Sequence, residues 1–140
     1  MYIYYNDNPG NFNVGDCVIR AISLALSYNW FMVHDELSFL SRKMLDMPSS
    51  NRVWKTYLKE KGYIEYEIEN TCPRCLTVEQ FAMSHPKGRY ILSTCEFSKA
   101  RDNLIVTGSH VLTLIDGDWY DTWDSGGDVP LSYFIVRQST

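Results

Sequence analysis

The chain has 140 residues and a formal net charge of −4, and 45% of its residues are hydrophobic. This length suits a single domain over residues 1–140, because domains commonly run to ~100–150 residues. No run approaches the roughly 20 apolar residues that span a bilayer, and no basic stripe is present, so we expect neither a membrane nor a nucleic acid as partner. The first residues lack the basic and apolar segments of a secretory signal, which predicts a cytoplasmic protein.

The first half of the chain is predicted to form a short strand and then three helices. Asn, Pro and Gly residues between positions 6 and 15 predict a structured loop before the first helix, which begins at Cys17. This helix is apolar on nearly all sides, so we expect it to be buried. In chain order, the predicted elements are a strand at Tyr2–Tyr5, a helix at 17–26, helices at Trp30–Met44 and Val53–Lys61, the latter closed by Gly62, and a strand at Tyr63–Ile68.

The second half is richer in strand-forming residues. Thr77 and Gln80 have the spacing of a capping box, so a short helix should begin there and end before Pro86. Asp116-Gly117 is a strong signal for a tight hairpin turn. Helices first and antiparallel strands afterwards indicate an α+β fold, with N-terminal helices packed on a C-terminal antiparallel sheet. The predicted strands are Arg89–Thr94, Ile105–Ile115, Asp118–Trp123 and Val129–Val136.

Cys17 stands where the buried helix is expected to begin. A thiol attacks a carbonyl as its thiolate, and the unpaired N–H groups at a helix start lower the pKa of a thiol. A base is then required, and His110 is the best of the three histidines, because it lies in a strand-forming segment directly after Gly108-Ser109. Alone, Cys17 would be an ordinary buried thiol and His110 a polar strand residue; their combination predicts catalysis.

The register of the predicted hairpin decides which acid lies near His110. A two-residue turn at Asp116-Gly117 places Asp121 on the same face of the hairpin as His110, diagonally across the ladder. A three-residue loop instead brings Asp124 opposite His110. We favour Asp121, because Asp-Gly prefers the shorter turn.

The order of these candidates along the chain resembles that of the papain-like cysteine peptidases. That family has a cysteine at a helix start, a histidine on a strand and a polar residue on the next strand. Asp121-Thr122-Trp123 is similar to the Asn-Ser-Trp segment of that family, in which the amide orients the histidine and the tryptophan shields the pair from water. The resemblance implies these roles for Asp121 and Trp123. It also implies that Asn11, six positions before Cys17, contributes to the oxyanion hole in place of the family's glutamine.

Four segments together are similar to small uncharacterised papain-like proteins of bacteriophages and mobile elements, distantly related to the peptidases that process bacteriocin leaders. The resemblance covers nearly the whole chain, and it implies a host cytoplasmic location if a phage encodes the protein. The stretch around the nucleophile departs from papain, because the Cys-Gly-Ser-Cys-Trp sequence is absent. The four segments are Gly15 to Ala21, Phe81 to Gly88, Gly108 to Val111 and Tyr120 to Ser125.

The other cysteines allow a metal site as a less favoured alternative. Without an export signal, we expect the thiols to be reduced. Two of them have zinc-knuckle spacing, although a redox disulfide between the same two is a further alternative. His85 lies in a turn that has its own structural reason, and Cys95 lies in an apolar strand, so we expect no metal and no cofactor. The candidate zinc ligands are Cys72, Cys75, His85 and Cys95.

The sequence therefore predicts a thiol hydrolase, a peptidase or isopeptidase, with a protein or peptide as substrate. His110 would take the proton of Cys17, and Asp121 would hold the imidazole in the correct tautomer. Acyl transfer by the same site, as in transglutaminase-like relatives, is one alternative. A catalytically inactive papain-like module that binds a host protein or ligand is a second, and a zinc-stabilised interaction domain is a third.

Overall fold

A computed structural model of the chain describes residues 1–69, 75–101 and 107–136. The helices in these ranges are α1 (Cys17–Leu26), α2 (Trp30–Met44), α3 (Asn51–Glu60), α4 (Val78–Ser84) and α5 (Phe97–Arg101). The strands are β1 (Tyr2–Tyr4), β2 (Tyr63–Glu67), β3 (Arg89–Cys95), β4 (His110–Ile115), β5 (Asp118–Asp121) and β6 (Val129–Val136).

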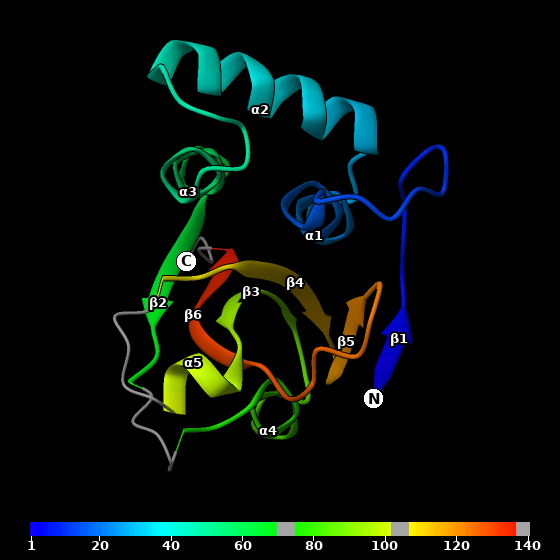
Figure 1. The fold of residues 1–140 in the computed structure, drawn as a ribbon, viewed down its shortest axis with the longest axis vertical. Helices are drawn as coiled ribbons and strands as arrows, with labels where there is room; N and C mark the ends of the chain where they lie inside the picture. The colour runs from blue at the N-terminus through cyan, green and yellow to red at the C-terminus, as the bar shows by residue number, and fades with distance from the viewer. Residues whose placement is uncertain (70–74, 102–106, 137–140) are drawn as a thin grey trace.

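The strands form one sheet with helices on both faces. Its order is β1-β5-β4-β3-β6-β2. β1 and β5 are parallel, and the other neighbouring strands are antiparallel. Figure 1 shows α1, α2 and α3 on one side of the sheet, with α4 and α5 on the other. The fold is thus α+β as expected, but the sheet is not purely C-terminal or antiparallel, because β1 and β2 from the first half form its two edges.

The hydrophobic core has two layers, one on each face of the sheet. Ile91 and Val111 pack with Ile22 and other residues of the first three helices. Their chain neighbours Leu92 and Leu112 pack with residues of α4 instead. This division follows from strand geometry, because successive side chains point to opposite faces. Each fully buried aliphatic side chain contributes roughly 1.5–3 kcal/mol, so the two layers fix the helices against the central strands.

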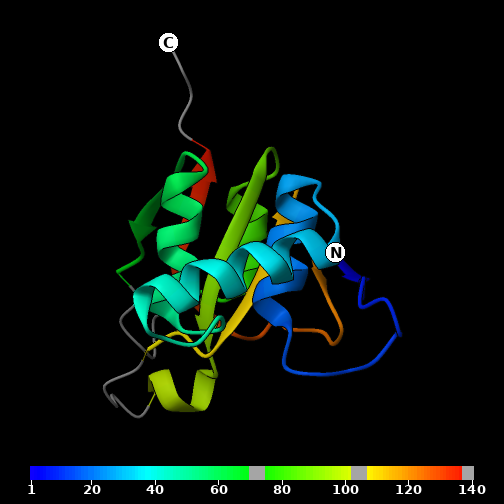
Figure 2. The same cartoon turned by 90° about the horizontal axis from the view of Figure 1, so that it is seen from above.

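Helix α1 lies between the sheet and α2. The hydroxyl of Thr113 in β4 donates a hydrogen bond of 2.7 Å to the carbonyl oxygen of Ala21 in the middle of α1. Figure 2 shows α2 crossing over α1 and α3. The apolar surface of α1 is therefore covered on both sides, as its sequence predicts. None of the helices in the described ranges is long and apolar enough to cross a membrane.

Local signals in the sequence set most helix ends. The side chain of Asn29 accepts a hydrogen bond of 3.0 Å from the backbone N–H of Met32 and so caps α2. Thr77 and Gln80 form the expected capping box at the start of α4. Gly62 has a φ of 89° and follows Lys61, the C-cap of α3, at a position where a left-handed residue is favoured.

Two helical features differ from the sequence-based expectation. Helix α3 begins at Asn51 rather than Val53, because Ser50 is extended and occupies the N-cap position. The side-chain Oδ1 of Asn51 also accepts a hydrogen bond of 2.9 Å from the indole of Trp54, which holds the first turn. Helix α5 was not expected, since residues Cys95 to Thr107 give no clear helical pattern.

The hairpin between β4 and β5 has the expected two-residue turn. Ile115 pairs with Asp118, as that turn requires. Asp116 and Gly117 have φ values of 48° and 84°, and positive φ at both central positions is typical of a type I′ turn. The predicted register is therefore confirmed. It places Asp121, the last residue of β5, beside the first residues of β4, which begins at His110.

Candidate active site

Cys17 is the first residue of α1 and has a partly buried free thiol. Burial raises the pKa of this thiol. The opposing effects are larger in sum: a hydrogen bond with His110, the charge of that imidazole and a backbone hydrogen bond from Val111 all lower the pKa. The charge of Arg20 also lowers the pKa of Cys17. The net result is a pKa below the ordinary thiol value, which favours the nucleophilic thiolate.

The start of α1 presents backbone N–H groups toward the position of the nucleophile. Asp16 occupies the N-cap position, but its side chain makes no capping hydrogen bond. The N–H groups of a helix's first turn have no partner within the helix, and the macrodipole places partial positive charge there. These groups favour negative charge next to Cys17, whether on the thiolate or on an oxygen of a bound substrate.

His110 is the first residue of β4 and is bonded to Asp121. Its Nε2 lies 2.5 Å from Oδ2 of Asp121, which leaves Nδ1 as the ring nitrogen for the Cys17 thiol. Burial alone lowers the pKa of His110, but the hydrogen bonds to Asp121 and Cys17 and their charges raise it to about 9. The imidazole of His110 is therefore held in its charged form at neutral pH, and its charge favours the thiolate form of Cys17.

Asp121 is buried at the end of β5, with its side chain 1% exposed. Oδ2 also accepts a hydrogen bond of 2.7 Å from the hydroxyl of Ser125, and Oδ1 accepts one of 2.9 Å from the backbone N–H of Thr122. These hydrogen bonds give both oxygens of the buried side chain a partner and fix its orientation. Asp121 is thereby held as an acceptor for His110.

A buried arginine links Asp121 to the start of the helix that carries Cys17. Arg20 pairs with Oδ1 of Asp16, and its second terminal nitrogen lies 3.5 Å from Oδ1 of Asp121. The other oxygen of Asp16 accepts from the indole of Trp30 at 3.0 Å and from the amide of Asn8 at 3.2 Å. Both oxygens of Asp16 are thus engaged by the side chains of other residues, which explains the missing cap. Sequence reasoning assigned this pair no role at the site, although its i, i+4 spacing was visible.

Trp123 and Asp124 follow Asp121 in sequence but have different surroundings. The ring centre of Trp123 lies 5.1 Å from that of His110 while the side chain stays 46% exposed, so the indole covers part of the imidazole. Asp124 instead accepts hydrogen bonds from the indole of Trp119 at 2.8 Å and from Gly126 at 3.0 Å. The alternative that placed Asp124 on His110 is therefore wrong.

Asn11 lies in the exposed loop before α1. Its φ is 57°, and its backbone N–H donates to the carbonyl of Asn8 at 2.8 Å. The loop is also held by the side chain of Asn8, which accepts from the N–H groups of Gly10 and Phe12 at 2.9 and 3.2 Å. Among the described residues, no hydrogen bond links the amide of Asn11 to the nucleophile, so its oxyanion role stays a prediction.

The candidate zinc ligands have other surroundings. Cys72 lies outside the described residues, and Cys75 is disulfide-bonded, so the expected reduced thiol is wrong for Cys75. Cys95 is a free thiol that is 1% exposed at the end of β3. His85 stacks on Phe81 with ring centres 3.9 Å apart. Within the described ranges, no three His, Cys, Asp or Glu side chains are arranged to hold a metal ion.

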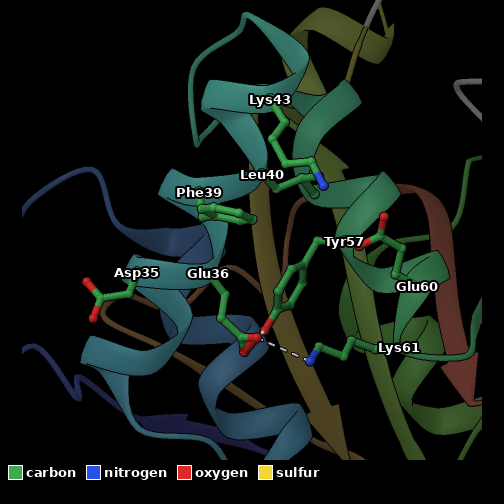
Figure 3. Close-up of a pocket in the computed structure, with 8 residues that line it drawn as sticks. All are labelled: Asp35, Glu36, Phe39, Leu40, Lys43, Tyr57, Glu60 and Lys61. Atoms are coloured by element: carbon green, nitrogen blue, oxygen red, sulfur yellow. Dashed lines mark hydrogen bonds and ion pairs between the residues drawn. The ribbon is translucent and has the colours of Figure 1, made fainter.

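A separate open hollow lies between α2 and α3, as Figure 3 shows. Its charged groups bond with one another, because Glu36 accepts from the hydroxyl of Tyr57 at 3.1 Å and from Lys61 at 3.2 Å. Lys43 lies over the ring of Phe39, 5.4 Å from its centre. None of the candidate catalytic residues lines this hollow, so it is distinct from the site.

Comparisons with protein-family models, with curated proteins and with solved structures find no match for this chain. A functional assignment therefore depends on the arrangement of Cys17, His110 and Asp121. These residues come from α1, β4 and β5, elements that the fold brings together from distant parts of the sequence.

Proposed function

We propose that this protein is a papain-like cysteine hydrolase that cleaves peptide or isopeptide bonds. The observation that supports it is the bonded series from Cys17 through His110 to Asp121, with the pKa of the thiol lowered and that of the imidazole raised to about 9. A passive buried thiol needs neither partner. Titratable groups whose pKa values are shifted by specific charge partners are typical of active sites.

Acylation begins when the Cys17 thiolate attacks the carbonyl carbon of the substrate, forming a C–S bond and moving an electron pair onto the oxygen. The backbone N–H of Cys17 stabilises this oxyanion, with the side-chain amide of Asn11 as the second donor. The imidazolium of His110 then gives its proton to the leaving nitrogen as the C–N bond breaks. A thioester on Cys17 and a neutral imidazole remain.

Deacylation reverses these roles. The neutral imidazole of His110 takes a proton from water, whose oxygen attacks the thioester carbon. The C–S bond then breaks, the carboxylic acid leaves, and the thiolate and imidazolium are restored. Asp121 holds the ring in one orientation and stabilises its charged form. Ser125, Thr122 and Arg20 in turn keep the carboxylate in place.

A chromogenic ester tests for the acyl-enzyme without knowledge of the natural substrate. When p-nitrophenyl acetate acylates Cys17, we expect a rapid release of p-nitrophenolate that is stoichiometric with the protein. Cys17→Ala should abolish this burst, whereas Cys95→Ala, which removes the second free thiol among the described residues, should retain it. A burst that persists in Cys17→Ala, or none in the wild type, would disprove the proposed function.

A mixture of diverse synthetic peptides then tests the bond that is cleaved. Mass spectrometry should detect fragments with the wild-type protein that are missing with Cys17→Ala. Repeating the reaction with added primary amine separates hydrolysis from acyl transfer. Products that carry the amine in place of the new carboxylate would identify an acyltransferase instead of a hydrolase.

A further inference from the structure

A small cavity lies beside the first turn of α1, next to the nucleophile. One wall is formed by residues that flank Cys17 in sequence, namely Gly15, Val18 and Ile19. The other is formed by residues of α2 and of the α2–α3 loop, such as Leu37 and Pro48. The volume of the cavity is about 150 Å³. It is therefore close in sequence and in space to the backbone that presents the reactive thiol.

The cavity offers a mainly apolar surface. Asp16 also lines it, but both oxygens of this carboxylate are engaged by Arg20, Trp30 and Asn8. His34, another lining residue, stacks on Trp30 with ring centres 5.1 Å apart. No described lining residue presents an unpaired buried charge, so the cavity suits an uncharged, apolar group.

We propose that this cavity binds the apolar side chain of a substrate residue next to the scissile bond. The inference rests on the proposed function, because it needs a carbonyl group positioned at Cys17. An apolar cavity of roughly 150 Å³ holds a benzene ring, so a leucine or phenylalanine side chain is of suitable size. Glycine would leave the cavity unfilled, and lysine would bring a charge without a partner.

The loop that leads into the nucleophile has further apolar surface. Phe12 is 66% exposed and Val14 is 52% exposed, which is unusual for large apolar side chains so near each other in sequence. Neither side chain lines the cavity, but this loop leads directly into Gly15, which does. An apolar peptide segment can therefore contact this loop while one side chain enters the cavity.

Small alkylating probes measure this preference directly at Cys17. N-acetyl-leucine chloromethyl ketone carries its side chain on the acyl side, and chloroacetyl-leucine amide carries it on the leaving side. In each, the thiolate attacks the methylene carbon, the C–S bond forms, and chloride leaves. In at least one pair, we expect the leucine probe to label Cys17 roughly tenfold faster than its glycine counterpart.

Substitution of Gly15 tests whether the cavity causes the preference. A Cβ on Gly15 meets no atom within 4 Å, so Gly15→Leu can be accommodated while its side chain obstructs the cavity. Each rate of Cys17 labelling is divided by the iodoacetamide rate of the same variant, which corrects for the reactivity of the thiol. In Gly15→Leu we expect the ratio of the leucine-probe rate to the glycine-probe rate to fall toward unity. Gly127→Leu is the matched control, because Gly127 is equally open and does not line the cavity, and it should retain the ratio.

The outcomes separate this inference from the proposed function. Rapid labelling of Cys17 by iodoacetamide, with equal rates for leucine and glycine in both probe pairs, would overturn the apolar subsite and leave the hydrolase intact. A ratio that survives in Gly15→Leu would likewise overturn the assignment to this cavity. Labelling of Cys17 no faster than that of a short cysteine peptide would overturn the proposed function, and the subsite with it.

Discussion

The guanidinium of Arg20 lies 3.5 Å from the carboxylate of Asp121, so the helix that carries Cys17 is tied to the acid that is bonded to His110. Both side chains are almost completely buried, at 6% and 1% exposed. A buried charge without its partner is strongly unfavourable, so the position of one side chain determines that of the other. The helix that carries Cys17 is thereby joined to β5 by a buried ion pair.

Removal of Arg20 should cost stability. For Arg20→Met we expect the free energy of unfolding to fall by about 3–5 kcal/mol, because two buried carboxylates lose their partner. Arg20→Lys, which keeps the charge, should lose less. Arg52→Met is a matched control at an exposed ion pair with Asp46 and should cost much less, because water screens exposed charges. Urea denaturation measures all three, and equal losses for Arg20→Met and Arg52→Met would contradict the prediction.

Substitution of the two candidate acids should have different effects. Asp121→Asn removes the charge that raises the pKa of His110, so labelling of Cys17 by iodoacetamide at pH 6.5 should slow on the order of tenfold. Asp124→Ala removes hydrogen bonds to Trp119 and Gly126, so it should lower the free energy of unfolding by about 1–2 kcal/mol while labelling stays fast. The reverse pattern would show that Asp124 serves His110 in solution.

The reactivity of Cys17 should depend on pH differently from that of an ordinary thiol. An ordinary thiol loses about tenfold in thiolate for each unit of pH below its pKa. Because the pKa of Cys17 lies below 9.0, its labelling rate should stay high as the pH falls from 9. The ratio of this rate to that of a short cysteine peptide should therefore grow until the pH reaches the lowered pKa of Cys17. Rates for protein and peptide that fall in parallel would refute this.

Peptide hydrolysis should show an upper pH limit set by His110. The leaving nitrogen needs a proton from the imidazolium, and the pKa of His110 is about 9. The rate of peptide cleavage should therefore decline as the pH rises through about 9, whereas iodoacetamide labelling, which needs no proton, should not decline. Parallel declines in both reactions would indicate loss of the fold rather than loss of the acid.

Trp123 should matter more for reactivity than for folding. The indole covers one side of His110 but is itself half exposed, so Trp123→Ala opens the ion pair to water without emptying the core. We expect the ester burst to slow severalfold, since water screens the attraction between imidazolium and thiolate. Phe39→Ala, which removes another exposed aromatic side chain away from the site, should leave the burst unchanged. Equal burst rates for the two variants would exclude shielding by Trp123.

The predicted role of Asn11 has its own signature. Asn11→Gly removes the amide without strain, because glycine tolerates the positive φ at this position. Loss of an oxyanion donor should slow the ester burst by about a hundredfold, but not iodoacetamide labelling, in which no oxyanion forms. Asn13→Gly in the same loop is the control. A burst that is equally fast in both variants would show that Asn11 is no donor.

The sequence predicts those parts of the site that depend on local structure. The Asp-Gly turn determines the register of β4 and β5, and that register selects Asp121 over Asp124. The apolar pattern after Cys17 determines where α1 begins, so the thiol is correctly placed at a helix start. Both inferences need only neighbouring residues and the periodicity of a helix or a strand.

Other parts depend on contacts that no local pattern reveals. Arg20 is one turn from Cys17, but its contact with Asp121 requires α1 to dock on the sheet beside β5. The parallel pairing of β1 with β5 likewise joins the two halves of the chain, whereas strand patterns alone indicated only antiparallel hairpins. Long-range pairing of this kind is a property of the tertiary fold, so it could not be derived from the periodicity of either segment.

The candidate site joins the two ends of the chain, so it can form only when the chain is nearly complete. The N–H of Tyr5 donates to the carbonyl of Asp121 at 2.8 Å, while the thiol belongs to residue 17 and its base to residue 110. During synthesis the N-terminal segments emerge first, so Cys17 remains an ordinary thiol until β4 and β5 have been made and paired. If the proposed function holds, rapid labelling of Cys17 should therefore report that the sheet is complete.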